Sequence, residues 1–135
     1  NKWYYFNGSG VMQTSKWINK TYYVQADGTM AKSKLVDNNK YYVDADGKWV
    51  KTTKWLKINN KWYYNISGNI QQSKWVKINN KWYYFNGSGV MQTSKWIDGT
   101  YYVQADGTMA VSKWVDGGKY YVGSDGKWIK NKYKK

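Results

Sequence analysis

The sequence predicts an all-β chain of about seven repeated β-hairpins, joined by Gly-rich loops and stacked as a solenoid. Three observations predict this fold: a Tyr-Tyr pair recurs every 18 to 22 residues, a turn dipeptide precedes the pairs, and a Gly-containing loop follows them. The pairs stand at residues 4–5, 22–23, 41–42, 63–64, 83–84, 101–102 and 120–121. Seven pairs predict seven hairpins.

The clearest copy of the repeat spans residues 74–96. Its first strand pattern ends at Asn79-Asn80, and both residues tolerate a positive φ, so they suit the tight primed turn of a hairpin. The chain returns through residues 81–85, and the segment 86–89 is too rich in Gly to continue a strand. We therefore expect each unit to be a hairpin followed by a loop that leads to the next hairpin.

The other repeats also have a turn dipeptide before the Tyr-Tyr pair. Their predicted turn dipeptides are Asn19-Lys20, Asn38-Asn39, Asn59-Asn60, Asp98-Gly99 and Gly117-Gly118. We predict one module over residues 1–135, with hairpin units at 1–14, 15–33, 34–53, 54–73, 74–94, 95–112 and 113–135. Since the pattern begins in the middle of a unit, we expect the chain to be a piece of a longer surface protein.

A longer period overlies the short one. Residues 2–17 are identical to residues 81–96, and residues 22–31 are identical to residues 101–110, both at an offset of 79. This duplication indicates an array extended in blocks. A lone two-stranded hairpin is marginally stable in water, so neighbouring hairpins are expected to stack their aromatic faces.

The composition favours binding over catalysis. Aromatic residues make up 20% of the chain, with 10 Trp and 15 Tyr but 2 Phe, and rings with a polar tip suit a binding surface as well as a core. His, Cys and Glu are absent, which removes the usual general bases, nucleophiles and transition-metal ligands. We predict no enzymatic activity, no cofactor and no metal site, and we interpret the Asp-Gly and Asn-Gly pieces as turns rather than calcium ligands.

The charge of the chain is strongly basic, with 22 Lys, 8 Asp and a net charge of +14. Such a charge predicts a long-range, salt-dependent attraction to phosphates. Lys interleaved with aromatic residues is also typical of single-strand nucleic-acid binders, but Arg is absent and the Lys residues are spread over every repeat, so we expect no nucleic-acid partner. No apolar run is long enough to cross a bilayer, and we expect no membrane insertion.

The spacing of the rings indicates a binding surface within each unit. Alternation along the returning strand sends Trp82 and Tyr84 to one face. Trp75 lies seven residues before Trp82 with a two-residue turn between them, so the two indoles are expected to approach each other across the hairpin. A Tyr from the next hairpin would complete an aromatic slot at the junction.

The pattern W-x(6)-W-Y-Y, followed by a Gly loop, a Met and another Trp, resembles the cell-wall-binding repeats of the choline-binding modules found on Gram-positive surface proteins and autolysins. The resemblance covers essentially the whole chain, although the glucan-binding repeats of glucansucrases share the Y-Y-F-x-x-x-G-x-M skeleton. It implies a left-handed superhelix of β-hairpins, with ligand sites between successive hairpins, in a secreted protein associated with the cell wall.

In that family, a site takes the opening Trp and the Trp before the Tyr-Tyr pair from one hairpin, and the second Tyr of the next. The implied ligand-binding sets are Trp55, Trp62 and Tyr84; Trp75, Trp82 and Tyr102; Trp3 and Tyr23; Trp17 and Tyr42; and Trp96 and Tyr121. The first two sets are complete, and the opening Trp of the third would precede residue 1. The last two lack one wall, because Thr21 and Thr100 replace the second Trp. Lys40 and Lys119 also stand at that position in their repeats, and Leu35 replaces an opening Trp.

The residue after each Gly loop has two interpretations, since a Met or a ring there can close the floor of a slot or fill the core. These residues are Met12, Met30, Trp49, Ile70, Met91, Met109 and Trp128. The ligand also has alternatives. A cage of rings suits the trimethylammonium group of a choline-bearing teichoic acid, whereas single ring faces suit the sugars of an α-glucan and would explain the units that lack the second Trp. A structural stalk without a ligand is the third alternative, and a homodimer through the terminal hairpins is a further interpretation.

Overall fold

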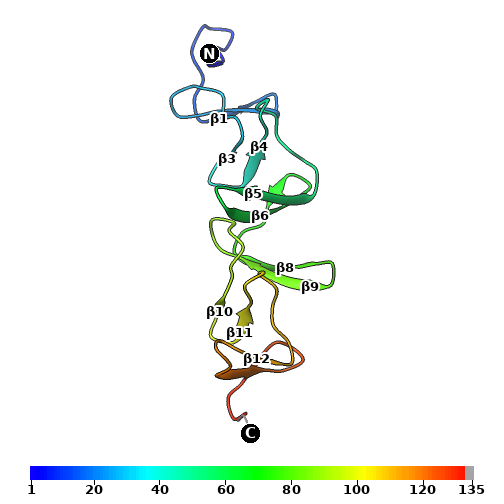
Figure 1. The fold of residues 1–135 in the computed structure, drawn as a ribbon. Helices are drawn as coiled ribbons and strands as arrows, with labels where there is room; N and C mark the ends of the chain where they lie inside the picture. Colours follow the sequence, from blue (N-terminus) through cyan, green and yellow to red (C-terminus); the bar gives the residue numbers. More distant parts are fainter. Residues whose placement is uncertain (133–135) are drawn as a thin grey trace. The chain divides into compact units, whose positions relative to one another are not determined.

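The computed structural model describes residues 1–132, and the predicted all-β chain of repeated hairpins is confirmed (Figure 1). Within this described part, no helix is long and apolar enough to cross a membrane. The last three residues of the predicted seventh unit, 133–135, lie outside the described residues. The chain divides into two compact units, one from Asn1 to Gln71 and one that begins at Gln72.

The first unit holds three hairpins of antiparallel strands (Figure 1). Residues 1–14 precede them and form isolated bridges, for example between Phe6 and Met12. The paired strands are β1 (Lys16–Ile18) with β2 (Tyr22–Val24), β3 (Lys34–Val36) with β4 (Tyr41–Val43), and β5 (Lys54–Ile58) with β6 (Lys61–Ile66), which also pairs with β7 (Asn69–Ile70).

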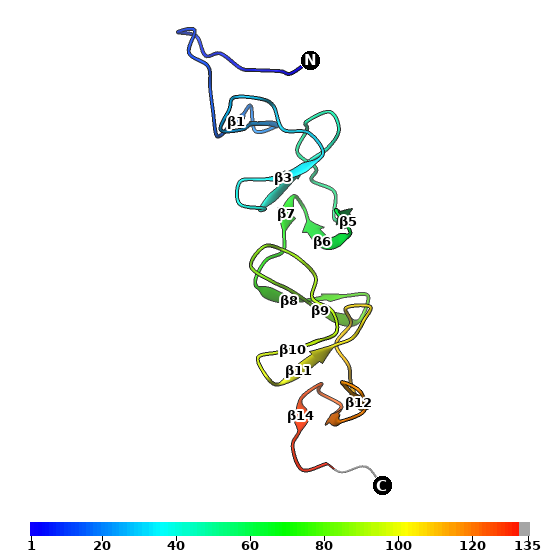
Figure 2. The ribbon, with the colours of Figure 1, turned by 60° about the vertical axis from the view of Figure 1, so that its left-hand side comes forward.

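The second unit repeats this organisation, and its hairpins follow one another in chain order (Figure 2). The paired strands are β8 (Lys74–Ile78) with β9 (Lys81–Phe85), β10 (Lys95–Ile97) with β11 (Tyr101–Val103), and β12 (Lys113–Val115) with β13 (Tyr120–Val122), which also pairs with β14 (Trp128–Ile129). Most of these strands have three residues, so the hairpins depend on their neighbours for stability.

The hairpin turns are made by residues that accept a positive φ. Asn79 and Asn80 have φ angles of 51° and 67° and form the two-residue turn between β8 and β9, as predicted. The predicted dipeptide Asn38-Asn39 lies within a longer turn, residues 37–40, because β3 and β4 separate one residue earlier on each side. The predicted hairpins, with positive-φ residues in their turns, are therefore confirmed, while the length of the turn varies along the chain.

Backbone hydrogen bonds at one repeated position join consecutive repeats. The residue after a Gly loop is here called the post-loop residue. At five positions it donates its amide to the carbonyl of the residue before the Tyr-Tyr pair of the preceding repeat. These bonds join Met30 to Trp3, Trp49 to Thr21, Ile70 to Lys40, Met109 to Trp82, and Trp128 to Thr100, at N–O distances of 2.8 to 2.9 Å. These five post-loop side chains are thereby held at the junctions between consecutive repeats.

The core is a series of small aliphatic clusters between hairpins. In the first unit, the buried residues Ala31, Val36 and Val43 form one cluster, and Trp17, Tyr23 and Tyr41 pack against it. In the second unit, Ala110, Val115 and Val122 form the equivalent cluster, and Trp96 and Tyr102 pack against it. The rings are therefore half-buried at the edge of the core, where they keep a surface for contact with a ligand.

Candidate functional site

Three rings form an aromatic box at the junction between the β1–β2 hairpin and the β3–β4 hairpin. Trp17 lies on β1, Tyr41 lies on β4, and Trp49 is the post-loop residue. The Tyr41 ring centroid is 5.5 Å from that of Trp17 at 86°, and 5.4 Å from that of Trp49 at 83°. The two indoles are 5.7 Å apart at 48°. These rings and Lys20 line a cavity of about 200 Å³, which we call the first box.

The second unit contains the same arrangement, the second box, built from Trp96 on β10, Tyr120 on β13 and Trp128 on β14. Its centroids are 5.7 Å apart for Trp96 and Tyr120, 5.6 Å for Tyr120 and Trp128, and 5.9 Å for the two indoles. Tyr120 is again nearly perpendicular to both indoles, at 85° and 89°. Trp96 Nε1 donates a hydrogen bond of 3.1 Å to Asp116 Oδ2, which fixes the orientation of that indole.

A different arrangement, the double-Trp slot, lies between the β8–β9 hairpin and the β10–β11 hairpin. Trp75 on β8, Trp82 on β9 and Tyr101 on β11 line it together with Met109 and Asp125, and the cavity measures about 280 Å³. The ring centroids of Trp75 and Tyr101 are 5.5 Å apart at 72°. Trp82 is 40% exposed, so the slot is open to solvent.

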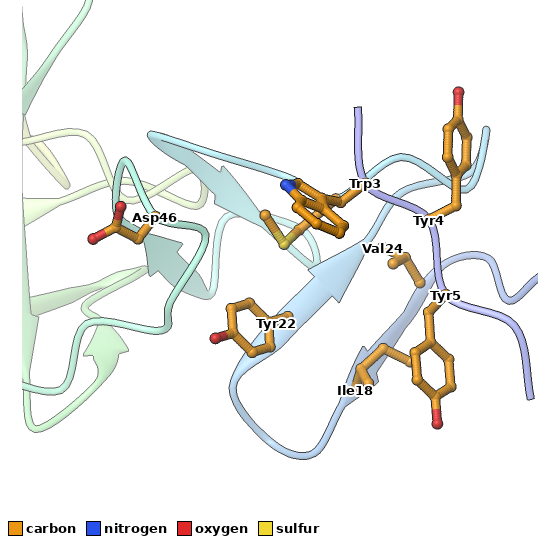
Figure 3. A pocket seen from close by; sticks show the side chains of 8 residues that line it. Trp3, Tyr4, Tyr5, Ile18, Tyr22, Val24 and Asp46 are labelled. Atoms are coloured by element: carbon orange, nitrogen blue, oxygen red, sulfur yellow. The ribbon is translucent and has the colours of Figure 1, made fainter. Parts of the chain in front are cut away.

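The first unit carries a counterpart of this slot, a cavity of about 340 Å³. Trp3, Tyr22, Met30 and Asp46 stand 79 residues before the equivalent residues of the double-Trp slot. Figure 3 shows Trp3 and Tyr22 close together, with Asp46 on a separate loop. The cavity is also lined by Tyr4, Tyr5, Ile18 and Val24.

Comparison with known proteins decides the family. The chain matches the family model described as "Choline-binding repeat" over residues 11–49 and 90–128, which is 78 of 135 residues. It also matches the model described as "Putative cell wall binding repeat" over residues 1–12, 53–64 and 73–91. The chain belongs to the choline-binding repeat family.

Solved structures of the family resemble these choline-binding repeats. The modular autolysin LytC from Streptococcus pneumoniae, solved with a synthetic peptidoglycan ligand, is 31% identical over 93% of this chain and 31% of its own, with a TM-score of 0.68. Choline binding protein F of the same species is 37% identical over 96% of this chain and 44% of its own, with a TM-score of 0.64. The choline-binding domain of Spr1274, also from S. pneumoniae, is 37% identical over 58% of this chain and 96% of its own, with a TM-score of 0.50.

The chain spans about a third of the length of LytC and less than half of choline binding protein F. A search among curated proteins returned no match. Since the matched regions are cell-wall-binding repeats, the chain is a cell-wall-associated or surface protein.

The walls of the slots and boxes differ from the prediction in one respect, because at these sites the first Tyr of a pair, and not the second, lies beside the rings of the preceding hairpin. Trp96 is paired directly with Tyr102, with ring centroids 5.2 Å apart, so these two rings share a face of their own hairpin. The turn expected at Asp98-Gly99 extends to Thr100, whose amide donates to the Ile97 carbonyl at 3.1 Å. This extra turn residue shifts the register of the β10–β11 hairpin by one position. Turn length does not decide which tyrosine is the wall, because in β8–β9, where the turn has two residues as predicted, Tyr84 likewise lies opposite Trp75.

This correction applies to the second tyrosines that were predicted as walls. In the register of the hairpins, Tyr23, Tyr42, Tyr84, Tyr102 and Tyr121 lie opposite Trp17, Leu35, Trp75, Trp96 and Trp114 of their own hairpins. The walls at the slots and boxes are instead the first tyrosines Tyr22, Tyr41, Tyr101 and Tyr120. The predicted tryptophans Trp3, Trp17, Trp75, Trp82 and Trp96 line these sites.

The predicted set Trp55, Trp62 and Tyr84 draws on both units. Within the first unit, the ring centroids of Trp55 and Trp62 are 6.0 Å apart at 89°, and Trp55 also lies 5.0 Å from Tyr64. The expected approach of two indoles across one hairpin is therefore present there. Tyr84 belongs to the second unit and lies 5.2 Å from Trp75, so a site formed by all three predicted residues stays a prediction.

The post-loop residues supply the walls that the prediction left missing. Trp49 and Trp128 complete the two boxes, and each bonds through its amide to the Thr that replaces the second Trp. The sequence carries a signal for this compensation. Where Thr precedes the Tyr-Tyr pair of one repeat, the next repeat has a Trp as its post-loop residue. Where Trp precedes the pair, as at Trp3 and Trp82, the post-loop residue of the next repeat is a Met. Without the hydrogen-bond partners, the signal could not be connected to the slots.

One junction of the choline-binding repeats is filled rather than open, and we call it the closed junction. Leu35, Tyr63 and Ile70 stand there at the positions that Trp17, Tyr41 and Trp49 hold in the first box, and Ile70 donates its amide to the Lys40 carbonyl as at the other junctions. Tyr63 and Ile70 are 6% and 5% exposed. Burial raises the pKa of the Tyr63 hydroxyl above its ordinary value of 10.0, which agrees with a phenol that packs against apolar atoms.

Proposed function

We propose that this module of seven hairpin units holds a secreted protein on a cell-wall polymer that carries choline, such as a teichoic acid, and that it catalyses no reaction itself. The observation that carries the proposal is the aromatic box, which occurs once in each unit with nearly the same centroid distances. The relative LytC was solved with a synthetic peptidoglycan ligand, which supports a wall polymer as the partner.

The geometry of the boxes favours a compact cation over a sugar. In the first box, Tyr41 stands nearly perpendicular to Trp17 and Trp49 around a cavity of about 200 Å³. A quaternary ammonium enclosed in this way gains about 0.5 to 2 kcal/mol from each favourable ring contact. A sugar instead stacks its flat face on one open ring, and the crossed walls of the box restrict that arrangement.

Charges near the sites are compatible with a polymer of choline phosphate. Asp125 lines the double-Trp slot, and its Oδ1 accepts a hydrogen bond of 2.9 Å from the Lys127 amide, which holds the carboxylate in place. A carboxylate beside three rings favours a cation. The net charge of +14 would repel free choline but attract the phosphates of the polymer.

Several weak sites along one chain would give firm attachment. Each box or slot engages one side group of the polymer, and binding at a second site is then intramolecular, so the overall affinity exceeds that of any single site. An anchoring module needs this property, because single contacts exchange while the protein as a whole stays attached.

The first test compares three ligands on the intact chain by Trp fluorescence. Choline should change the signal in a saturable way, and 3,3-dimethyl-1-butanol, its uncharged isostere, should bind about tenfold more weakly or worse because it lacks the charge that the rings attract. Isomaltooligosaccharides should give no saturable change. A response to the sugars alone would favour the α-glucan alternative, and no response to any ligand would favour a stalk.

The second test uses two tryptophans in matched positions. Trp96 and Trp114 each stack on the second Tyr of their own hairpin, at 5.2 and 5.3 Å, but Trp96 also forms a wall of the second box. Trp96→Ala should remove one choline site in calorimetry, whereas Trp114→Ala should leave the number of sites at these boxes and slots unchanged. Circular dichroism checks that both variants fold. Equal effects on choline binding would contradict the assignment of the box.

A further inference from the structure

We propose that a groove next to the double-Trp slot binds a phosphate group, so that slot and groove together hold a choline and the phosphate to which it is esterified. The inference rests on the proposed function and adds a second subsite to it. It concerns the part of the polymer beyond the ammonium group, which the aromatic walls do not recognise.

The groove and the slot are two cavities that share a wall. The groove measures about 320 Å³, and Trp82 and Met109 line both it and the slot. The other lining residues of the groove are polar or exposed: Asn80, Lys81, Gln104, Thr108, Val111 and Lys113. A ligand that passes over the edge of Trp82 would therefore leave an aromatic environment and enter a polar one.

The two cavities carry charges of opposite sign. Among the residues that line the slot, the charged one is Asp125, whereas the charged residues that line the groove are Lys81 and Lys113. Choline phosphate has the same separation of charge, since two methylenes and an ester oxygen lie between its ammonium and its phosphate. Ammonium donors are suited to phosphate oxygens, with which they form charge-assisted hydrogen bonds.

Lys113 is held at the groove by a neutral partner. Its Nζ donates to Gln104 Oε1 at 2.9 Å, and Gln104 Nε2 in turn donates to Thr108 Oγ1 at 3.1 Å. An amide oxygen positions the ammonium group without cancelling its charge. Lys113 can therefore offer its remaining N–H donors to an anion.

Lys81 has an acidic neighbour and is the weaker of the two contacts. The hydroxyl and the amide of Thr108 donate to Asp106 Oδ1, at 2.6 and 2.9 Å, and these bonds are the main cause of a lowered pKa of that carboxyl, with a smaller contribution from the charge of Lys81. The ionised Asp106 offsets part of the charge of Lys81. Lys113 should thus contribute more to binding of a phosphate.

The first unit repeats this arrangement with one added charge. Lys34 Nζ donates to Gln25 Oε1 at 2.7 Å, and Gln25 Nε2 donates to Thr29 Oγ1 at 2.9 Å, as in the second unit. At the offset of 79, Lys32 stands where the groove of the second unit has Val111. The chain therefore offers a natural comparison between the two forms of this site.

The test follows single indole N–H signals in an NMR titration of the ¹⁵N-labelled chain, with the Trp82 signal assigned through Trp82→Phe. Choline, phosphocholine and inorganic phosphate are compared at constant ionic strength. Phosphocholine should bind at Trp82 about twofold to tenfold more tightly than choline, as expected for one or two solvent-exposed charge pairs. Inorganic phosphate should reduce this advantage without changing the affinity for choline.

Variants separate the groove from the slot. Lys113→Met keeps the aliphatic stem of the side chain. It should abolish most of the advantage of phosphocholine over choline while the affinity for choline stays the same. The control Lys119→Met, in a turn outside the groove lining, should change neither the affinity for phosphocholine nor that for choline. Val111→Lys, which copies Lys32, should increase the advantage. If Lys113→Met disturbs the fold, Lys81→Met provides the same measurement with a smaller effect.

The outcomes are distinct for the two proposals. If phosphocholine binds no more tightly than choline, or if Lys113→Met weakens both ligands equally, the groove is not a phosphate subsite, and the choline-binding function still stands. If choline itself causes no shift of any indole signal, the proposed function fails, and the inference fails with it.

Discussion

Two junctions of the first unit share a backbone arrangement and differ in the side chains that fill it. At the first box, Trp49 donates its amide to Thr21 at 2.9 Å, and at the closed junction Ile70 donates to Lys40 at the same distance. The first junction surrounds a cavity with three rings, whereas at the second Tyr63 and Ile70 are buried and Leu35 stands at the position of Trp17. Stacking of hairpins is therefore possible without a slot, and the rings of the boxes exceed what the fold requires.

One indole wall of a site can come from either of two positions, the residue before the Tyr-Tyr pair or the post-loop residue of the next repeat. The double-Trp slot uses Trp82 and a post-loop Met109, while the second box has Thr100 and a post-loop Trp128 at the equivalent positions. An indole lost at one position is replaced at the other, and the count of rings around the junction is kept. At the closed junction neither position holds a Trp, since they are occupied by Lys40 and the buried Ile70.

The largest expected effect comes from removing a wall of the first box. Trp49→Ala would delete contacts with Trp17 and Tyr41 and the hydrogen bond of 2.9 Å from Trp49 Nε1 to the Gly68 carbonyl. We expect the free energy of unfolding to fall by about 3 kcal/mol, measured by urea denaturation, and one choline site to be lost in calorimetry.

The matched control for that variant lies at the closed junction. Ile70→Ala removes a buried post-loop side chain and should also destabilise the unit, by about 2 to 4 kcal/mol, but the number of choline sites should not change. If the two variants lower the number of sites equally, the box has no special role in binding.

The second prediction converts the closed junction into a box. The double variant Leu35→Trp and Ile70→Trp places indoles at the positions that correspond to Trp17 and Trp49, beside Tyr63. We expect one additional choline site in calorimetry, together with a loss of stability of about 1 to 3 kcal/mol from overpacking. Leu35→Trp alone should add no site, and a folded double variant with unchanged stoichiometry would refute the interpretation.

The smallest predicted effect concerns the charge beside each box. Lys20 lines the first box, and the second box has Gly99 at the equivalent position, preceded by Asp98 in place of Asn19. The variant Asn19→Asp with Lys20→Gly should bind choline about twofold to fivefold more tightly at the first box, because a nearby cation is removed and an acid is added.

Fluorescence titration at low and high salt measures this effect. The gain should largely disappear at about 1 M salt, where charges are screened within a few ångströms. Lys40→Gly, in the turn of the closed junction, is the control and should leave the choline affinity unchanged. An affinity gain that persists at high salt would indicate an effect of turn shape rather than of charge.

Local features of the sequence were sufficient to predict the hairpins but not which tyrosine faces the slot. Asn79 and Asn80 adopt the positive φ angles that their side chains favour, so the turn could be predicted from two residues. The role of Tyr101 follows from the pairing of Trp96 with Tyr102, because adjacent residues of a strand lie on opposite faces. The second Tyr is paired in the same way in hairpins whose turns have two or four residues. Trp49 and Trp128 were found as walls through backbone bonds to residues 28 positions earlier, which local patterns do not reveal.

The backbone hydrogen bonds from five post-loop residues to the preceding repeats have a consequence for how such a protein evolves. The rings of each box and slot come from two adjacent repeats, so inserting another block would create new sites and keep the aromatic walls of the old ones. The overall affinity for a wall polymer could therefore be raised or lowered by changing the number of repeats, without any substitution in an existing pocket.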